Sequence, residues 1–176
     1  MIRLIKKTSN KISYWQVWKV EKNLHILSGT VGVSGNEEEI PLTLFASSKK
    51  VMKKLAEEKV YQGYEYVDEK SMIKVVVQYR YEDEEQFEET EEKSFLVEDL
   101  LDDALFSTGI GELYGSEIGD GAGTTSCLVL DVEIALETIK KVLSQHNLLQ
   151  GVELAYLNED GVYVSLYPEG ADFVLV

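Results

Sequence analysis

The first third of the chain shows the alternation of apolar and polar positions that is typical of half-buried strands. Tyr14–Val20 (Y-W-Q-V-W-K-V) carries large side chains on both faces, so we expect both faces to be at least partly covered. A three-residue turn leads to the apolar run Leu24–Leu27, and the glycines of S-G-T-V-G-V-S-G predict a second reversal of the chain. Together these features predict an antiparallel meander.

Helical spacing replaces this alternation after Pro41 and the short run Leu42–Phe45. In S-S-K-K-V-M-K-K-L-A-E-E-K-V the apolar residues recur every three or four positions beneath a lysine-rich face, which predicts an amphipathic helix. Ser47 or Ser48 is placed to cap this helix. The polar segment Val67–Ser71 then marks the predicted end of a first unit.

The next segments contrast an apolar strand with an acidic run. Met72–Tyr81 is the strongest predicted strand and is expected to lie centrally in its sheet. Glu82–Lys93 holds eight acidic residues and one basic residue, which predicts a solvated excursion or an extended edge. A calcium loop is not indicated, because the D-x-D-x-D-G spacing is absent. Phe95–Phe106 has apolar residues at one-turn spacing and predicts a helix that Ser94 and Glu98 would cap.

The remaining elements complete a recognisable order. We expect a strand at Ser126–Val132, a helix from about Glu133 to Gln145, a strand at Val152–Leu157, and a tight turn into a last strand at Val162–Tyr167. The order β-α-β-β-α-β with an added strand is that of the ferredoxin-like sandwich, in which two helices cover one face of an antiparallel sheet. The sequence therefore predicts an α+β protein.

A glycine-rich stretch from Thr108 to Thr125 holds six of the thirteen glycines and invites comparison with a phosphate-binding loop. Such loops follow a strand and open a helix, whereas this stretch follows a predicted helix and leads into a predicted strand. Its acidic residues, Glu112, Glu117 and Asp120, would also repel a phosphate. A strand and turn that pair with the next strand are therefore favoured, with glycine supplying bulges and positive φ angles.

Charge divides the chain into two parts and predicts two domains. Residues 1–70 hold 12 basic and 9 acidic residues, a net charge of +3, whereas residues 71–176 hold 5 basic and 23 acidic residues, a net charge of −18. Such a shift indicates two units with different surfaces. We therefore expect one domain at 1–70 and an acidic α+β domain at 71–176.

Composition and the N-terminal residues predict a cytoplasmic protein. No window approaches the roughly 18 apolar residues that a membrane-spanning helix requires, and the N-terminal run carries charges and no small-residue cleavage site. The single cysteine, Cys127, lies in the apolar run C-L-V-L and is expected to be a buried small hydrophobe. A soluble protein in a reducing compartment is the expectation.

The first unit resembles the WGR domain family, whose sequences join an aromatic-rich strand, a W-G-R-x-G-x-x-G turn, an F-x-S segment, a lysine-rich helix and a closing K-x-x-G-Y. The resemblance covers about the first sixty-eight residues. The matching positions are Tyr14, Trp15, Trp18, Gly29, Gly32, Gly35, Phe45, Ser47 and Tyr61-Gln62-Gly63-Tyr64. The second unit more loosely resembles a group of bacterial ferredoxin-like domains with no assigned activity.

Membership of the WGR family would imply contact with nucleic acid. Ser28-Gly29-Thr30 stands where the family has Trp-Gly-Arg, and the acidic triplet Glu37–Glu39 follows the loop. The basic residues that remain to contact phosphates are Lys49, Lys50, Lys53 and Lys54 on the predicted helix. Because affinity for nucleic acid depends on cations that face phosphates, the expected binding is weak.

Catalytic and metal-binding patterns receive no support. His25 lies in an apolar run and His146 follows a predicted helix, so both are expected to be structural. Neither a Ser-His-Asp arrangement nor a zinc-ligand spacing is present. Glu112 and Glu117 could act as an acid and base pair, but 32 acidic residues make some such pair inevitable. We therefore expect a protein that has no catalytic activity and binds neither a cofactor nor a metal ion.

Two functions remain as hypotheses. The favoured one is a non-enzymatic cytoplasmic protein whose two units together form a docking surface for a protein partner. A basic partner, such as a nuclease held by an immunity-type inhibitor, suits the acidic second unit, with Glu112, Glu117 and Asp120 as partner contacts. The alternative is a weak nucleic-acid-binding protein that uses Lys49, Lys50, Lys53 and Lys54.

Overall fold

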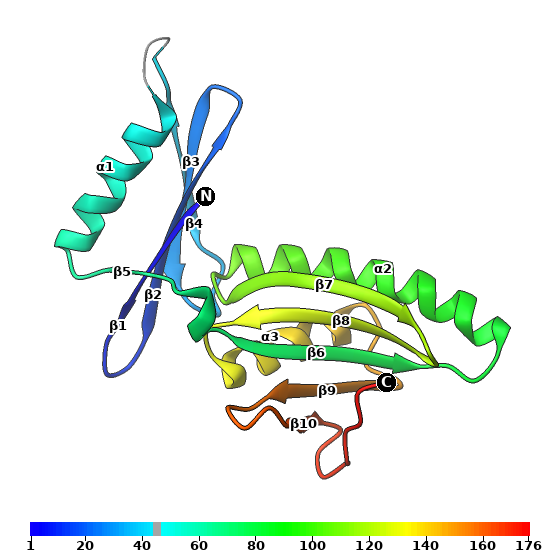
Figure 1. Cartoon of the computed structure of the whole chain (residues 1–176). Coiled ribbons are helices and arrows are strands. Elements are labelled where there is room, and N and C mark those ends of the chain that lie inside the picture. Colours follow the sequence, from blue (N-terminus) through cyan, green and yellow to red (C-terminus); the bar gives the residue numbers. More distant parts are fainter. Residues whose placement is uncertain (44–46) are drawn as a thin grey trace. The chain divides into compact units, whose positions relative to one another are not determined.

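The computed structural model describes residues 1–43 and 47–176 (Figure 1). The described residues form two antiparallel sheets of five strands each, together with three α-helices, which confirms the predicted α+β class. They fall into two compact units. The first unit is Met1–Lys70 with Ser107–Gly109, and the second is Ser71–Phe106 with Ile110–Val176.

The first unit contains an antiparallel meander, as the hydrophobic pattern predicts. Strands β1 (Ile2–Lys7), β2 (Ile12–Val20), β3 (Asn23–Thr30) and β4 (Asn36–Pro41) are neighbours in chain order, and β5 (Glu65–Tyr66) pairs with β1. Helix α1 (Ser48–Tyr61) lies along one side of this sheet (Figure 1). Ser47 occupies the N-cap position of α1, although its side chain makes no capping hydrogen bond.

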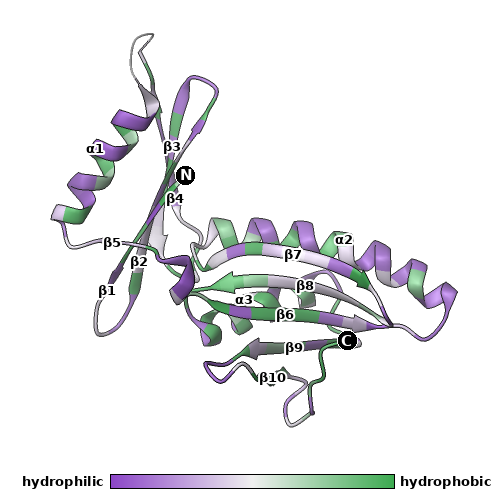
Figure 2. Cartoon of the chain, in the orientation of Figure 1, coloured by the Kyte–Doolittle hydropathy of each residue, from purple (hydrophilic) through white to green (hydrophobic). Residues whose placement is uncertain are grey.

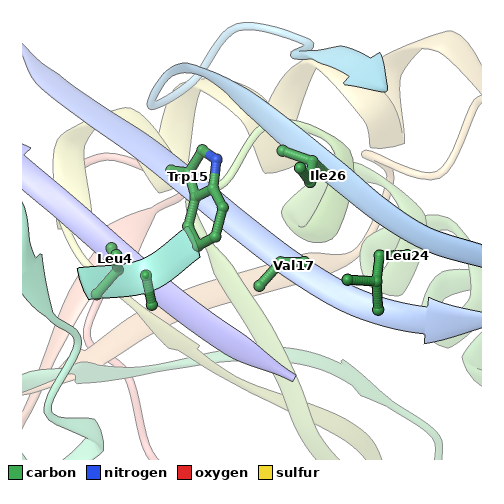
Figure 3. Packing of buried hydrophobic residues seen from close by; sticks show 6 residues of the cluster. Leu4, Trp15, Val17, Leu24 and Ile26 are labelled. Carbon is green, nitrogen blue, oxygen red and sulfur yellow. The ribbon is translucent and has the colours of Figure 1, made fainter. Parts of the chain in front are cut away.

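The core of the first unit lies between its sheet and α1. Trp15 and Val17 point to the same face of β2 and pack with apolar residues of β1, β3 and α1 (Figure 3). The full set of buried residues in this cluster is Leu4, Trp15, Val17, Leu24, Ile26 and Ala56. On the opposite face of β2, Tyr14 and Gln16 are also fully buried, so the expectation that both faces are covered is confirmed. Each large apolar side chain buried here contributes about 1.5–3 kcal/mol relative to its exposed state.

Three residues from the glycine-rich stretch belong to the first unit. The backbone carbonyl of Ser107 accepts hydrogen bonds from the Tyr14 hydroxyl at 2.9 Å and from the Gly35 N–H at 3.0 Å. The Thr108 carbonyl accepts another from the Gly32 N–H at 3.0 Å. The predicted domain boundaries, 1–70 and 71–176, assign Ser107–Gly109 to the second domain. The local sequence pattern of these three residues does not indicate their distant hydrogen-bond partners.

The second unit has the strand order of a ferredoxin-like sandwich. Its elements are β6 (Ile73–Arg80), α2 (Glu84–Ser107), β7 (Gly111–Gly119), β8 (Ala122–Val129), α3 (Val132–Gln145), β9 (Val152–Leu157) and β10 (Tyr163–Tyr167). The strands pair antiparallel in the order β10-β9-β6-β8-β7, so β6 is central, as predicted, and β10 is the added strand. Helices α2 and α3 lie on the same side of this sheet (Figure 1).

The acidic run Glu82–Lys93 is part of a helix, so its assignment as a solvated excursion or extended edge is wrong. Helix α2 begins at Glu84, and the Asp83 carboxylate accepts a hydrogen bond from the Gln86 N–H at 2.9 Å. Acidic residues in the first turn are favoured by the helix dipole. Figure 2 shows how hydrophilic this first half of α2 is. Ser94 is consequently not a cap but a buried residue in the middle of the helix.

The glycine-rich stretch forms the β7–β8 hairpin, which confirms the strand-and-turn prediction. Asp120 and Gly121 occupy its turn with φ angles of 53° and 95°, and the register shifts by a bulge between Leu113 and Gly115. Strand β8 begins four residues before the predicted Ser126, because Ala122 to Thr125 pair with both β6 and β7. It ends at Val129, since Asp131 caps α3 by accepting from the Ile134 N–H at 3.0 Å.

Candidate functional site

Helix α2 presents an acidic surface that also carries apolar side chains. The exposed acidic residues of this helix are Glu84, Glu85, Glu88, Glu89, Glu92, Asp99, Asp102 and Asp103. Among them, Phe95 is 63% exposed and Leu96 is 45% exposed. The helix has one basic residue, Lys93, whose Nζ lies 3.5 Å from Glu89 and 5.2 Å from the centre of the Tyr79 ring. The surface therefore combines a strong negative charge with two exposed large apolar groups.

A hollow of about 100 Å³ lies between α2 and β7, and we call it the α2–β7 hollow. It is lined by Glu91, Ser94, Phe95, Glu98, Ser116, Glu117 and Ile118. The four residues from α2 share one face because they are spaced by three or four positions, and the three from β7 are consecutive along the strand. Glu91 and Glu98 thus flank a space with apolar walls from Phe95 and Ile118. Glu117 pairs with Thr124, whose hydroxyl bonds to Gln78, so its side chain lies on the other face of the sheet.

Ser94 lines this hollow, but its hydroxyl oxygen faces Gly123 of β8. Its side chain is 8% exposed, and its hydroxyl oxygen is buried without a hydrogen-bond partner. The close approach of β8 is possible because residue 123 is glycine, where an added Cβ would lie 2.3 Å from the Ser94 Oγ. A buried polar group without a partner costs about 1–3 kcal/mol.

The predicted partner contacts Glu112, Glu117 and Asp120 all lie on β7 or its turn. Glu117 lines the α2–β7 hollow and, together with Asp120, a second hollow at the end of the hairpin. Glu112 is opposite Leu128 at the other end of β7 and lines neither hollow. The contributions of Glu91, Phe95 and Glu98 were not predicted, although their spacing of four and three residues would place them together once the helix was extended to Glu84.

A third hollow, of about 200 Å³, lies on the sheet face opposite the helices. Lys74, Thr124 and Ser126 line it from β6 and β8, and the Lys74 Nζ lies 5.6 Å from the centre of the Tyr114 ring. Glu117 also lines it, so one cation and one anion share this hollow. This mixture of charges differs from the cluster of backbone N–H groups and cations that holds a phosphate.

The same sheet face holds Gln78, a fully buried side chain that uses its whole hydrogen-bonding capacity. Its Nε2 donates to Glu153 Oε2 at 2.7 Å and to the Val174 carbonyl at 3.0 Å. Its Oε1 accepts from the Val176 N–H at 3.1 Å and from Thr124 Oγ1 at 3.4 Å. Arg80 also donates to the Val174 carbonyl at 2.7 Å, so the last residues of the chain are fixed to this face by their backbone.

The lysines of α1 are exposed, as the predicted nucleic-acid contact requires. Lys49, Lys50, Lys53 and Lys54 all face solvent, and the Lys53 Nζ lies 3.7 Å from Glu57 one turn later. At the end of the helix, Lys6 and Lys59 lie 6.0 and 5.7 Å from the centre of the Tyr64 ring, and Tyr61 is 95% exposed. Phe45, one of the matching positions of the WGR resemblance, lies outside the described residues.

The acidic triplet lies on the edge strand β4 rather than in a loop. His25 Nδ1 is 2.9 Å from Glu37 Oε1 and 3.8 Å from Glu39 Oε1, and its ring stacks on Trp18 with 5.7 Å between ring centres. His25 thus links β3 to β4, which is a structural role. Ser28 and Thr30 are paired with β2 through the backbone, opposite Trp15 and Ser13.

Other reactive or ligating groups of residues 1–43 and 47–176 are either buried or dispersed. Burial raises the pKa of the Cys127 thiol to about 12, with a smaller effect from Asp102, so the thiolate is scarce at neutral pH. Across residues 1–43 and 47–176, no group of three or more His, Cys, Asp or Glu side chains is arranged to hold a metal ion. Within the same residues, no helix is long and apolar enough to cross a membrane.

Comparison of the chain with protein-family models, with curated proteins and with solved structures gives no match.

Proposed function

We propose that the chain is a non-enzymatic cytoplasmic protein that docks a basic protein partner through α2 and β7 of its second unit. An inhibitor of a basic enzyme, such as an immunity protein for a nuclease, is the specific form of this proposal. The observation that carries it is the exposure of Phe95 and Leu96 within the acidic surface of α2.

Charge and apolar exposure have separate parts in such docking. The negative charge of the second unit attracts a basic partner and raises the association rate. An exposed aromatic side chain supplies the buried contact that most often dominates the binding energy of an interface. A solvated helix face needs acidic residues but gains nothing from exposing Phe95, so the combination favours an interface.

Strand β7 offers a second means of contact beside α2. It stands at the end of the strand order, so one of its edges pairs with no strand of the described chain. An extended segment of a partner can add to such an edge through backbone hydrogen bonds. The partner-facing side of β7 would then bring Glu117 into the interface.

Quantitative cross-linking of the full chain in an extract of its host tests this proposal. We expect cross-links from α2 and β7 to one basic protein, with a yield that falls as the salt concentration rises from 50 to 500 mM because exposed charges are screened. Cross-links that fall mainly on α1, or a partner with an acidic surface, would contradict it.

A weak nucleic-acid-binding protein is the second candidate, and the exposed lysines of α1 favour it. The net charge of −15 opposes it, because the chain as a whole repels phosphates. We expect the full chain to bind duplex DNA no more tightly than about 10⁻⁴ M at physiological salt, the weak end of nonspecific binding. Fluorescence anisotropy decides the matter. Micromolar binding that is abolished by reversing Lys49, Lys50, Lys53 and Lys54 would favour this candidate over protein docking.

A further inference from the structure

We propose that the hollow on the sheet face opposite the helices, which we call the open-face hollow, binds a neutral sugar ring. It has a volume of about 200 Å³ and is lined from β6, β7 and β8. Binding here goes beyond the docking proposal and does not depend on it, because α2 lies on the other side of the sheet (Figure 1).

The alternation of side chains along the strands brings four polar groups together on this face. Successive side chains of a strand point to opposite faces, so Thr124 and Ser126 of β8 share one. The Thr124 hydroxyl lies 3.4 Å from Gln78 Oε1 on β6, and Lys74 shares the face of Gln78 because four residues separate them. Glu117 of β7 is opposite Thr124. The hydroxyls of β8 therefore form a floor between a cation on one side and a carboxylate on the other.

The Ser126 hydroxyl is the observation that points to a ligand. Ser126 is 9% exposed and lines the hollow, and its hydroxyl forms no hydrogen bond to any other residue of 1–43 and 47–176. A hydroxyl that is withdrawn from bulk water without gaining a partner is destabilising. A ligand hydroxyl satisfies it in either direction, because both groups can donate and accept. The floor of the hollow is thus incomplete until a polar ligand occupies it.

The two charges at the sides of the hollow are not neutralised within the chain. In the part of the chain that the structure describes, neither Lys74 nor Glu117 belongs to an ion pair. An anionic ligand would be repelled by Glu117, and a cationic one by Lys74. A neutral ligand with several hydroxyls avoids both conflicts, since it can accept from the ammonium and donate to the carboxylate in charge-assisted hydrogen bonds.

Tyr114 supplies the wall on which a sugar ring packs. The register of β7 shifts by a bulge between Leu113 and Gly115, and a bulge redirects the side chain of its extra residue, here Tyr114. The Tyr114 ring lies 5.6 Å from the Lys74 Nζ and remains 65% exposed. A pyranose has an apolar C–H face, which suits an aromatic ring, and hydroxyls around its edge, which suit the floor. The volume is below the roughly 300–1,000 Å³ of pockets for larger ligands, which favours a single ring.

The test uses the full chain and three probes, methyl β-D-glucopyranoside, methyl β-D-galactopyranoside and methyl α-D-mannopyranoside, followed by chemical shifts in nitrogen–proton correlation spectra. We expect at least one probe to give saturable shifts centred on Tyr114, Thr124 and Ser126, with a dissociation constant of about 1–10 mM. The three affinities should differ by about threefold or more, because fixed hydrogen bonds distinguish the orientation of a hydroxyl. Salt between about 50 and 500 mM should leave the affinity unchanged, since the ligand carries no charge to be screened.

Matched variants locate the site. Tyr114→Ala should weaken binding about tenfold, whereas Tyr114→Phe keeps the ring and should stay within about twofold of the parent chain. Ser126→Ala should weaken binding about threefold. Tyr61→Ala removes a tyrosine that is 95% exposed in the first unit and does not line the hollow, so it should have no effect. Thermal midpoints would verify that each variant folds, and the Tyr114 pair tests the site even where Ser126→Ala does not fold.

The absence of saturable shifts with all three glycosides up to about 100 mM would overturn the inference, as would equal shifts with glycerol. Tighter binding of glycylglycine than of any glycoside would also overturn it, because that result would indicate a site for a zwitterion. Equal loss in Tyr114→Phe and Tyr114→Ala would contradict stacking on the ring. The proposed docking function fails by a different result, namely that no basic protein is cross-linked to α2 or β7.

Discussion

A Cβ atom placed on Gly109 would lie 2.3 Å from the Cγ atom of the Tyr14 ring. These residues are 95 positions apart in the sequence, and Gly109 also has a φ angle of +64°. The same tyrosine donates its hydroxyl proton to the carbonyl of Ser107. The segment Ser107–Gly109 is thus fixed against β2 by one ring, and glycine is the residue that permits the contact.

Gly109→Ala is expected to destabilise the protein by about 2–4 kcal/mol, because it combines a left-handed backbone with overlap against a buried ring. The midpoint of urea unfolding, followed by tyrosine and tryptophan fluorescence, measures this. Gly115→Ala is the matched control, since a Cβ there would meet nothing within 4 Å. Equal effects of the two substitutions would show that the Tyr14 contact is not what requires glycine at 109.

Gln78→Leu is expected to cost about 2–4 kcal/mol, because it removes the acceptor of the Val176 N–H and one of the two donors that reach the Glu153 carboxylate and the Val174 carbonyl, the other being Arg80. It should also release the C-terminal residues from the sheet. Hydrogen exchange would then show faster exchange at Val176 in the variant. Gln145→Leu, at the exposed end of α3, serves as the control and should change neither quantity. Unchanged exchange at Val176 in Gln78→Leu would count against Gln78 as the anchor.

Gly123 and Ser94 are expected to be energetically coupled across α2 and β8. Gly123→Ala alone should destabilise the protein by about 1–3 kcal/mol through overlap with the Ser94 Oγ, an overpacking effect. In a Ser94→Ala background the same substitution should cost at least about 1 kcal/mol less, since the overlapping atom is gone. A double-mutant cycle by urea unfolding measures the difference. Additive effects would place the overlap elsewhere, for example at the Thr90 methyl group, which lies 3.0 Å from the added Cβ.

Cys127 is expected to react slowly with a thiol reagent in the folded protein. Burial raises its pKa from 9.0 to about 12, so at pH 8 its thiolate fraction is about 10³-fold lower than that of an ordinary thiol. The folded state therefore favours the protonated thiol. Its contribution to stability is fully present below pH 9 and is lost as the pH rises from 9 to 12. Cys127→Ala should lose less stability over this range than the parent protein, and equal losses would contradict the assignment.

Sequence patterns predicted most of the fold, and the errors have physical causes. The strands β6, β9 and β10 have continuous apolar or alternating runs, which are strong local signals. Helix α2 was predicted too short because two positions of its buried face, Thr90 and Ser94, are polar, and the acidic residues around them resemble a solvated segment. Strand β1 was missed because Arg3 and Lys6 interrupt its apolar residues.

The candidate site was less predictable than the fold. Glu117 could be singled out from its glycine-rich surroundings, but the residues opposite it depend on where α2 passes over the sheet. That position depends on the small size of Gly123, which admits Ser94, and no local pattern encodes such a packing relationship. The insertion of Ser107–Gly109 into the first unit likewise rests on hydrogen bonds to residues more than seventy positions away.

The docking claim is tested most directly by two charge-reversal variants compared in the same host extract. One carries Glu85→Lys, Glu92→Lys and Asp103→Lys on the exposed face of α2, and the other carries Glu133→Lys, Glu137→Lys and Glu159→Lys at exposed positions of α3 and the β9–β10 turn. Both change the net charge equally. We predict that quantitative affinity capture recovers the same basic protein with the parent chain and the α3 variant, and at least tenfold less with the α2 variant, a difference of about 1.4 kcal/mol. Equal recovery by the two variants would contradict docking through α2.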